Sequence, residues 1–290
     1  MANDKVIGFI GLGAMGLPMA KNLIKANYRV IGLNRSKGKE QQFIEAGGEG
    51  GLSLQEIVKQ ADVLMTCLPF PEDVEKVILG DDGIVSNGRP EQVIIDFSTV
   101  SPTLNRKVYD KAQEKQMKFL DAPISGGNFG AEAGTLSIMV GGDKDVFDAM
   151  LPLFEILGEN IYHVGECGSG SIVKLVNNLM VGFHSQAVAE ALNLGEKMGV
   201  NSDVLFDILN ASYAQSRVFE RHYENFISKD EYTPGFAMKL LHKDLRIAGE
   251  LADEQNIPLP IGKQLTSMLK KAVDSGHGDQ DMSALYLYLK

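Results

Sequence analysis

Hydrophobic and polar positions alternate along this chain in two different ways. Up to about residue 164, short apolar runs of strand length are separated by longer segments whose apolar residues recur with helical spacing. Such a succession predicts one doubly wound sheet with helices on both faces. The expected strands cover residues 6–10, 28–33, 61–68, 93–96, 118–120 and 134–141, and we expect the last of these to complete the sheet.

Beyond residue 164 the pattern predicts helices only. Residues 171–198 are apolar on nearly all sides of a helix, which is typical of a helix buried in an interface between domains or subunits. Further helical segments follow, and glycines at positions 165, 168 and 170 mark the change of character. We therefore expect an α/β domain over residues 1–165 and an all-helical domain over residues 166–290.

A glycine-rich turn connects the first expected strand to the helix after it. Gly11, Gly13 and Gly16 have the G-x-G-x-x-G spacing. Gly11 allows the tight turn, Gly13 lets backbone N–H groups approach a pyrophosphate, and Gly16 lets the helix pack on the strand. This spacing also serves plain packing, but its place between a strand and a helix predicts a Rossmann-like dinucleotide-binding domain. The cofactor-binding residues expected here are Gly11, Leu12, Gly13, Ala14, Met15 and Gly16.

The residues after the second expected strand bear on the choice of cofactor. Folds that bind NAD usually place Asp or Glu about 20 residues past the glycines, where the carboxylate holds the ribose hydroxyls. This chain has Asn34, Arg35 and Ser36 there instead. Arg35 can pair with a 2′-phosphate in a charge-assisted fork, and the Ser36 hydroxyl can donate to it. We therefore favour NADP over NAD, with a solvated basic turn as the alternative.

Later strands are followed by further candidates, because ligands of such sheets bind at the carboxyl ends of the strands. The next two strands lead to residues that either line the cofactor groove or only cap their loops, namely Leu68, Pro69 and Thr99. A Ser-Gly-Gly step later in the chain can present successive N–H groups and a hydroxyl to an anion, a carboxylate in particular. Its residues are Ser125, Gly126 and Gly127, and a flexible turn is the alternative.

Lys174 and Asn178 share one face of the long predicted helix. When a carbonyl is reduced, negative charge develops on its oxygen, and a nearby ammonium group can stabilise that charge and donate the proton. Asn178 can hold the substrate oxygen or orient Lys174. The alternative for Lys174 is a side chain that extends its charge into water.

Two more lysines, Lys239 and Lys243, share a side of a later helix, and one of them is expected to reach the nicotinamide end of the cofactor. His242 beside them is expected to be solvated. The other histidines show no metal-like spacing with carboxylates or cysteines, so we predict no metal.

Composition narrows the classes of partner. The formal net charge of -10 over 290 residues argues against nucleic acid and anionic membranes as partners. Two cysteines imply no disulfide framework, and no apolar stretch reaches the length of a membrane span. We therefore expect no nucleic-acid or membrane partner and a cytoplasmic setting.

Four separated blocks of this chain resemble the β-hydroxyacid dehydrogenase family, which includes 3-hydroxyisobutyrate dehydrogenase and tartronate semialdehyde reductase. The blocks are residues 8–16, residues 121–127 continuing to 134–136, residues 168–178 and residues 243–245. The resemblance covers nearly the whole chain and implies a Rossmann-like domain followed by an all-α domain. It also implies a homodimer or homotetramer formed through the helical domain.

The same resemblance implies roles for individual residues. It assigns the catalytic lysine to Lys174, its supporting asparagine to Asn178 and the lysine near the nicotinamide to Lys243. It assigns the substrate carboxylate to Ser125, Gly126 and Gly127, and contacts with the cofactor to Leu68, Pro69 and Thr99.

Our first hypothesis is an NADP-dependent reductase of a short semialdehyde acid, such as tartronate semialdehyde, with Lys174 as proton donor or, in the reverse oxidation, acceptor. Polar residues in the segment expected to line the substrate pocket, Tyr213, Gln215 and Ser216, favour a hydroxylated or longer polar substrate over a methyl-bearing one. The alternatives are a 3-hydroxyisobutyrate dehydrogenase and a succinic semialdehyde or sulfolactaldehyde reductase. A hypothesis from another class is a non-catalytic cofactor-binding protein on the same scaffold.

Overall fold

The computed structural model describes residues 5–290. Residues 1–4, the start of the expected first domain, lie outside the described residues. Contacts within the chain divide it into two units, Met1–Lys174 and Leu175–Lys290. The division falls inside helix α9 (Ser169–Lys197), whereas the boundary expected from the sequence, after residue 165, precedes that helix and stays a prediction.

The first unit is built on an eight-stranded sheet with the order β2-β1-β3-β4-β5-β7-β6, in which β8 also pairs with β7. Strands β2 to β5 in this order are parallel, and β7 is antiparallel to β5 and β6 but parallel to β8. The strands are β1 (Val6–Ile10), β2 (Arg29–Leu33), β3 (Val63–Thr66), β4 (Val93–Asp96), β5 (Lys118–Asp121), β6 (Ile124–Ser125), β7 (Leu136–Gly142) and β8 (Gly158–Gly165).

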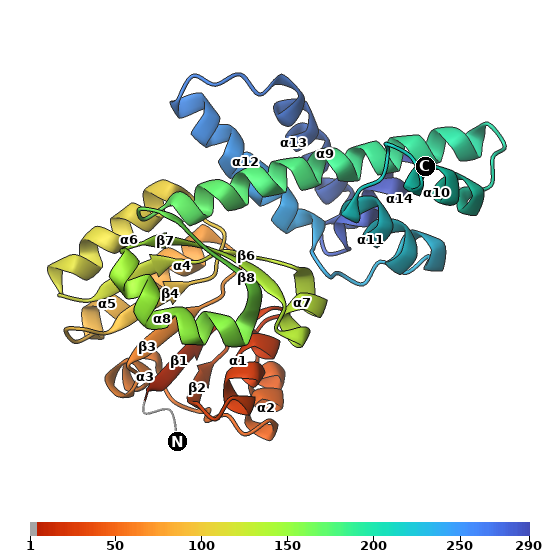
Figure 1. Cartoon of the computed structure of the whole chain (residues 1–290). Coiled ribbons are helices and arrows are strands. Elements are labelled where there is room, and N and C mark those ends of the chain that lie inside the picture. The colour runs from red at the N-terminus through yellow and green to blue at the C-terminus, as the bar shows by residue number, and fades with distance from the viewer. Residues whose placement is uncertain (1–4) are drawn as a thin grey trace. The chain divides into compact units, whose positions relative to one another are not determined.

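Helices cover both faces of this sheet (Figure 1). Because successive side chains of a strand point to opposite faces, Ile7 and Phe9 pack into one core and Ile10 into the other. The first core includes buried residues of α1 (Gly16–Lys25), α2 (Lys37–Glu45) and α8 (Lys144–Leu157), and the second those of α3 (Leu54–Gln60), α4 (Pro71–Leu79), α5 (Ile84–Asn87) and α6 (Pro102–Glu114). The predicted doubly wound α/β domain is therefore confirmed.

One expectation about the sheet is wrong. The strand over residues 134–141 was expected to be the last, but β8 follows it and pairs with β7 in parallel. Most β8 residues are exposed or half-buried, and Glu159 and Asn160 stand near its start. An exposed strand does not need a continuous apolar run, so the hydrophobic pattern gave no sign of it. Helix α2 also shows little hydrophobic pattern, because only Glu40 and Phe43 of its nine residues are buried.

The second unit is helical, as predicted. Its core gathers large apolar side chains from several helices, among them Leu192, Phe219, Leu241 and Leu269. Beside the rest of α9 it contains α10 (Ser202–Asn210), α11 (Arg217–Asn225), α12 (Met238–Glu254), α13 (Pro260–Ala272) and α14 (Leu285–Leu289), with short 3-10 turns between them. Across residues 5–290, no helix combines the length and apolar character that crossing a bilayer would require.

A buried carboxylate organises the loop before α12. Asp281 accepts two hydrogen bonds from the Arg221 guanidinium, at 2.9 and 2.6 Å, and three more from the backbone N–H groups of Gly235, Phe236 and Ser283. Burial alone would raise the pKa of Asp281, but the bonds from Arg221 and the backbone outweigh it, and the pKa lies below its ordinary value.

Candidate active site

The glycine turn lies where the strand order reverses, because β1 has β2 on one side and β3 on the other. Gly11 has φ +99°, and a Cβ atom there would lie 2.3 Å from the Cys67 carbonyl oxygen. A Cβ atom at Gly16 would lie 1.9 Å from the Gly11 carbonyl oxygen, whereas one at Gly13 would meet nothing within 4 Å. Gly11 and Gly16 thus permit close backbone packing, and Gly13 faces open space, as a turn that admits a dinucleotide requires.

Asn34 has a defined structural task at the end of β2. Its Oδ1 accepts the backbone N–H of Leu12 at 3.0 Å, and its Nδ2 donates to the Ser36 carbonyl at 3.1 Å. The side chain therefore ties the glycine turn to the start of α2. Arg35 and Ser36 are exposed there, and the Ser36 side chain makes no capping hydrogen bond to the helix.

Two further polar side chains connect the loops that follow β3 and β4. Thr66 Oγ1 donates to Asp96 Oδ1 at 2.7 Å, and the Ser98 N–H donates to the same oxygen at 3.0 Å. Ser98 Oγ in turn accepts the N–H of Leu68 at 2.9 Å. Burial raises the pKa of Asp96, although the bonds from Ser98 and Thr66 oppose that rise. This network, which the sequence did not reveal, fixes the backbone at Leu68.

The Ser-Gly-Gly step has a specific backbone shape. Ser125 ends β6 opposite Ser137 of β7, and α7 (Gly127–Ala133) begins two residues later. Gly126 has φ +138° and Gly127 has φ +64°, values that side chains with a Cβ atom rarely adopt. The glycines are thus required by the turn itself.

Lys174 lies one turn after the start of α9 and is 8% exposed. The first turn of that helix is tied to the sheet, because Asp121 at the end of β5 accepts the N–H groups of Gly168 and Ser171 at 2.7 and 3.0 Å. Asn105 of α6 also donates to Ser171 Oγ at 2.7 Å. A lysine this buried differs from the solvated alternative considered above.

In the second unit, Asp244 connects two residues that the sequence predicts for the site, Asn178 and Lys243. The sequence analysis gives Asp244 itself no role. Asn178 Nδ2 donates to Asp244 Oδ2 at 2.6 Å, and Lys243 Nζ lies 3.0 Å from Asp244 Oδ1. All three side chains are buried. The Asn178 Oδ1 atom also accepts a hydrogen bond from Asn177 at 3.0 Å. Asp244 therefore fixes the amide of Asn178 and neutralises Lys243.

The structure also separates the two lysines on α12. The Lys239 side chain is 42% exposed and pairs with Asp279, whereas Lys243 is buried. His242 between them is half-buried, and this burial lowers its pKa. Within the described residues, no group of three or more His, Cys, Asp or Glu side chains is arranged to hold a metal ion.

Two polar residues of the segment before α11, which the sequence analysis places at the substrate pocket, form local hydrogen bonds. Ser216 Oγ accepts the N–H of Phe219 at 3.0 Å as the cap of α11, and Gln215 Nε2 donates to Glu220 at 3.0 Å. Both side chains thus have local structural partners. Tyr213, in contrast, is fully exposed.

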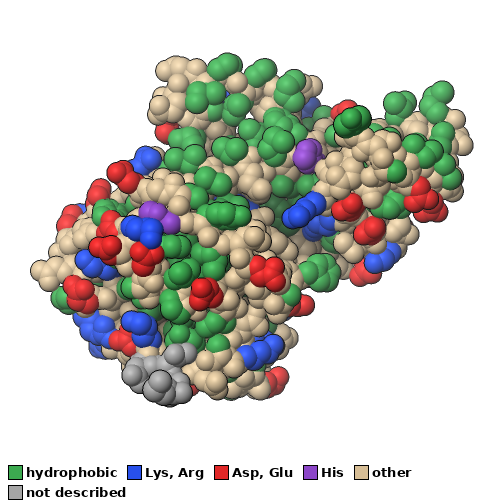
Figure 2. Space-filling model, in the orientation of Figure 1, with side chains coloured by type: hydrophobic (Ala, Val, Ile, Leu, Met, Phe, Trp, Pro, Cys, Tyr) green, Lys and Arg blue, Asp and Glu red, His purple; other side chains and the backbone are tan. Residues whose placement is uncertain are grey.

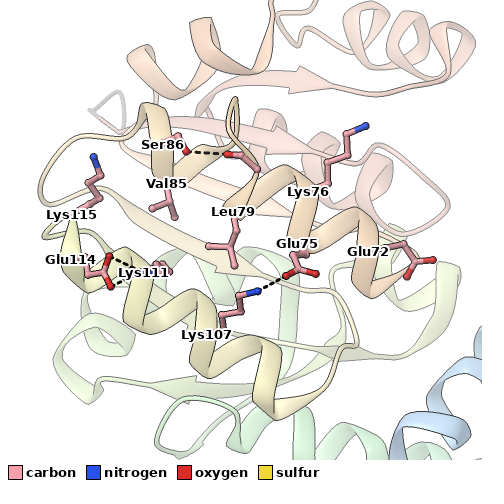
Figure 3. A pocket seen from close by; sticks show the side chains of 11 residues that line it. Glu72, Glu75, Lys76, Leu79, Val85, Ser86, Lys107, Lys111, Glu114 and Lys115 are labelled. Atoms are coloured by element: carbon pink, nitrogen blue, oxygen red, sulfur yellow. Dashed lines mark hydrogen bonds and ion pairs between the residues drawn. The ribbon is translucent and has the colours of Figure 1, made fainter.

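A surface pocket elsewhere on the first unit contains none of these residues. It measures about 630 Å³ and opens between α4, α5 and α6 (Figure 3). Four of its charged side chains form ion pairs, Lys107 with Glu75 at 2.5 Å and Lys111 with Glu114 at 2.7 Å. We therefore assign it no ligand.

Both units match models of dehydrogenase families. Residues 6–165 match the NAD binding domain of 6-phosphogluconate dehydrogenase, and residues 168–289 match the family described as NAD-binding of NADP-dependent 3-hydroxyisobutyrate dehydrogenase. The chain is 40% identical to 2-(hydroxymethyl)glutarate dehydrogenase of Eubacterium barkeri, over 96% of this chain and 93% of that protein. It is 34% identical to 2-hydroxy-3-oxopropionate reductase of Escherichia coli (strain K12), over 96% and 95% of the two chains.

A solved structure agrees with these matches over the full length. The 3-hydroxyisobutyrate dehydrogenase of Mycobacterium tuberculosis, determined with L-serine, has a TM-score of 0.88 and 32% identity, and 99% of each chain is covered. This chain therefore belongs to the β-hydroxyacid dehydrogenase family, as its four sequence blocks indicated. It is an NAD(P)-dependent oxidoreductase that acts on a CH–OH group.

Proposed function

We propose that this protein is an NADP-dependent enzyme that interconverts a short semialdehyde acid and its hydroxy acid, with tartronate semialdehyde as the first candidate substrate. The observation that carries the proposal is the buried Lys174, held one turn after an anchored helix start. A buried amine at a fixed position suits a group that must exchange a proton with a substrate oxygen.

The residues of the first unit fit a dinucleotide. The open space at Gly13 and the tight packing at Gly11 and Gly16 suit a turn that cradles a pyrophosphate. Asn34 holds that turn and brings no carboxylate charge, while Arg35 and Ser36 stand exposed at the start of α2, where a 2′-phosphate would be attracted. The bound cofactor would supply or accept a hydride. Leu68, Pro69, Thr99 and Lys243 complete the proposed cofactor contacts.

The protein's own groups would handle the proton and the orientation of the substrate. In the reduction, the Lys174 ammonium donates a proton to the aldehyde oxygen, and in the oxidation the neutral amine accepts the alcohol proton. Asn178, oriented by Asp244, has a second Nδ2 hydrogen with which it can hold the same oxygen. The backbone and hydroxyl of Ser125, Gly126 and Gly127 bind the substrate carboxylate.

The choice among substrates rests on the names of relatives and on one polar residue, Tyr213. One relative is named for 2-hydroxy-3-oxopropionate, which is tartronate semialdehyde, and another for 2-(hydroxymethyl)glutarate. Since Gln215 and Ser216 have local partners, the preference for a polar substrate now depends on Tyr213. Oxidation of 3-hydroxyisobutyrate is the second candidate, because a similar structure carries that name. Reduction of succinic semialdehyde or sulfolactaldehyde stays a less favoured alternative, and the dehydrogenase relatives speak against a non-catalytic protein.

A spectrophotometric panel tests this proposal. Purified protein would be given tartronate, methylmalonate and succinic semialdehydes, glyoxylate and sulfolactaldehyde, each with NADPH and with NADH. We expect tartronate semialdehyde with NADPH to give the highest kcat/KM. A higher kcat/KM with methylmalonate semialdehyde would favour the 3-hydroxyisobutyrate assignment, and a preference for NADH would refute the cofactor assignment.

Assembly is a separate part of the proposal. Hydrophobic side chains are exposed over the helical unit (Figure 2), and those on α9 include Val176, Met180 and Leu194. Their spacings are close to whole numbers of helical turns, so these side chains lie along one side of the helix. They form a stripe that a second copy can cover. We expect a homodimer or homotetramer by light scattering, and a monomer would contradict this. The cytoplasmic setting stays a prediction.

A further inference from the structure

The first turn of α9 is capped by a side chain from a distant part of the sequence. The N–H groups at a helix start have no partner within the helix. Here Asp121 Oδ1 accepts the N–H of Gly168 and Oδ2 that of Ser171, although Asp121 is 47 and 50 residues away in sequence. Each carboxylate oxygen thus holds one backbone donor, and the negative charge lies at the positive end of the helix.

The surrounding backbone is shaped to admit this carboxylate. A Cβ atom at Gly141 would lie 2.6 Å from Asp121 Oδ1, and one at Gly170 would lie 2.8 Å from Oδ2 and 2.2 Å from the Met139 carbonyl oxygen. Two glycines therefore let β7 and the start of α9 approach Asp121 closely. Asp121 is 1% exposed, so water cannot replace its contacts easily.

Asn105 makes a second connection to the same turn. Its Nδ2 donates to Ser171 Oγ at 2.7 Å, and both residues are buried. The turn is thus joined to β5 by Asp121 and to α6 by Asn105. Lys174 follows Ser171 by three residues and lies on the same side of the helix, so these connections determine where its side chain begins.

We propose that Asp121 is a positioning residue for Lys174, because it fixes the first turn of α9 at the carboxyl end of β5. This inference rests on the proposed function in that Lys174 is taken as the proton donor. Asp121 touches neither the substrate nor the cofactor in this account. A catalytic group displaced by about 1 Å can lose a factor of about 10² in rate, so loosening the turn should lower kcat.

Asp121→Asn is the informative substitution. An amide has one oxygen and one NH₂ group, so one backbone N–H would face a donor in place of an acceptor. Asp96→Asn is the matched control for replacing a buried carboxylate by an amide. Asp96 is equally buried and lies beside Asp121 on the neighbouring strand, in the register of β4 and β5. Within the described residues, its Oδ1 accepts hydrogen bonds from Thr66 and Ser98, which lie outside α9, and its Oδ2 has no hydrogen-bond partner.

Two measurements on the full-length protein test the proposal. Amide hydrogen exchange over residues 166–176 should become at least about tenfold faster in Asp121→Asn and stay unchanged in Asp96→Asn. The kcat of Asp121→Asn should fall by about 10- to 100-fold, while the Kd for NADPH stays within about twofold. If Asp121→Asn fails to fold, Asp121→Glu, which keeps the charge but shifts the carboxylate by one methylene group relative to the N–H groups of Gly168 and Ser171, should lower kcat with the NADPH Kd unchanged.

Unchanged exchange in Asp121→Asn would overturn the anchoring role. Faster exchange with unchanged kcat, or a parallel loss of kcat and NADPH binding, would overturn the positioning role. In the Asp121→Glu arm, an unchanged kcat would do the same. Wild-type protein and Lys174→Ala are measured beside these variants: if Lys174→Ala retains full turnover, the proposed function fails, while the exchange result still decides whether Asp121 holds the turn.

Discussion

Replacing Asp244 by Asn tests how the buried polar groups of the second unit depend on one another. The substitution removes the negative charge that faces Lys243 at 3.0 Å, and it leaves one amide oxygen in place of the two carboxylate oxygens that now face Lys243 and, at 2.6 Å, Asn178. Removing one member of a buried ion pair costs about 3–5 kcal/mol, because the remaining charge stays buried and loses the opposite charge that faces it. At about 2–4 °C per kcal/mol for a chain of this size, Tm should fall by roughly 6–20 °C.

The surface of the same helix offers a matched control. Lys239 and Asp279 form the same kind of pair at 2.5 Å, but their side chains are 42% and 87% exposed. An exposed pair contributes about 0–1 kcal/mol, so Asp279→Asn should shift Tm by less than about 4 °C. Thermal unfolding of both variants by calorimetry gives the comparison. Equal shifts for Asp244→Asn and Asp279→Asn would refute the reasoning from burial.

Three further predictions concern pH, the glycine turn and the cofactor. Burial lowers the pKa of His222 to about 3 from the ordinary value of 6.5, so the unfolded chain binds more protons than the folded chain between these pH values, and stability is lost as pH falls below 6.5. His222→Gln should therefore reduce the pH dependence of the unfolding free energy, measured with denaturant between pH 7 and 4. An unchanged pH dependence would contradict this. Gly13→Ala should weaken NADPH binding at least about tenfold in a fluorescence titration, with Tm nearly unchanged. Gly16→Ala should instead lower Tm, because its Cβ atom would meet the Gly11 carbonyl oxygen. The reverse pattern would refute the assignment of Gly13 to the cofactor and of Gly16 to backbone packing. Arg35→Asp should weaken binding of NADPH and leave NADH nearly unaffected, and an equal loss for both would show that Arg35 does not contact the 2′-phosphate.

The sequence predicts well what local pattern determines. Strand β4 is found at its observed bounds because residues 93–95 form an apolar run that ends at Asp96, and the glycine turn is found because its spacing is fixed by local geometry. Strand β8 was missed because its residues are largely exposed, so no hydrophobic period marks it. Ser216, in the segment before α11, also caps that helix, which the sequence did not indicate, and the place of this segment in a substrate pocket stays a prediction.

The buried carboxylates show why the rest of the site could not be predicted. In the sequence, Asp96, Asp121 and Asp244 resemble ordinary acidic residues, and each obtains its role from partners 30 or more residues away. Only the topology brings these partners together, since β3 and β4 are neighbours and α12 meets the helix that carries Asn178. The one local signal was that two of these residues immediately end buried strands.

The most direct test of the account is the turnover of Lys174→Ala with tartronate semialdehyde and NADPH, measured beside Lys239→Ala and beside NADPH binding by each variant. Loss of a positioned proton donor costs about 10²–10⁴ in rate. The account predicts a loss of that size for Lys174→Ala with an NADPH Kd within about twofold of wild type, and near-normal turnover for Lys239→Ala. Normal turnover by Lys174→Ala would contradict the central claim.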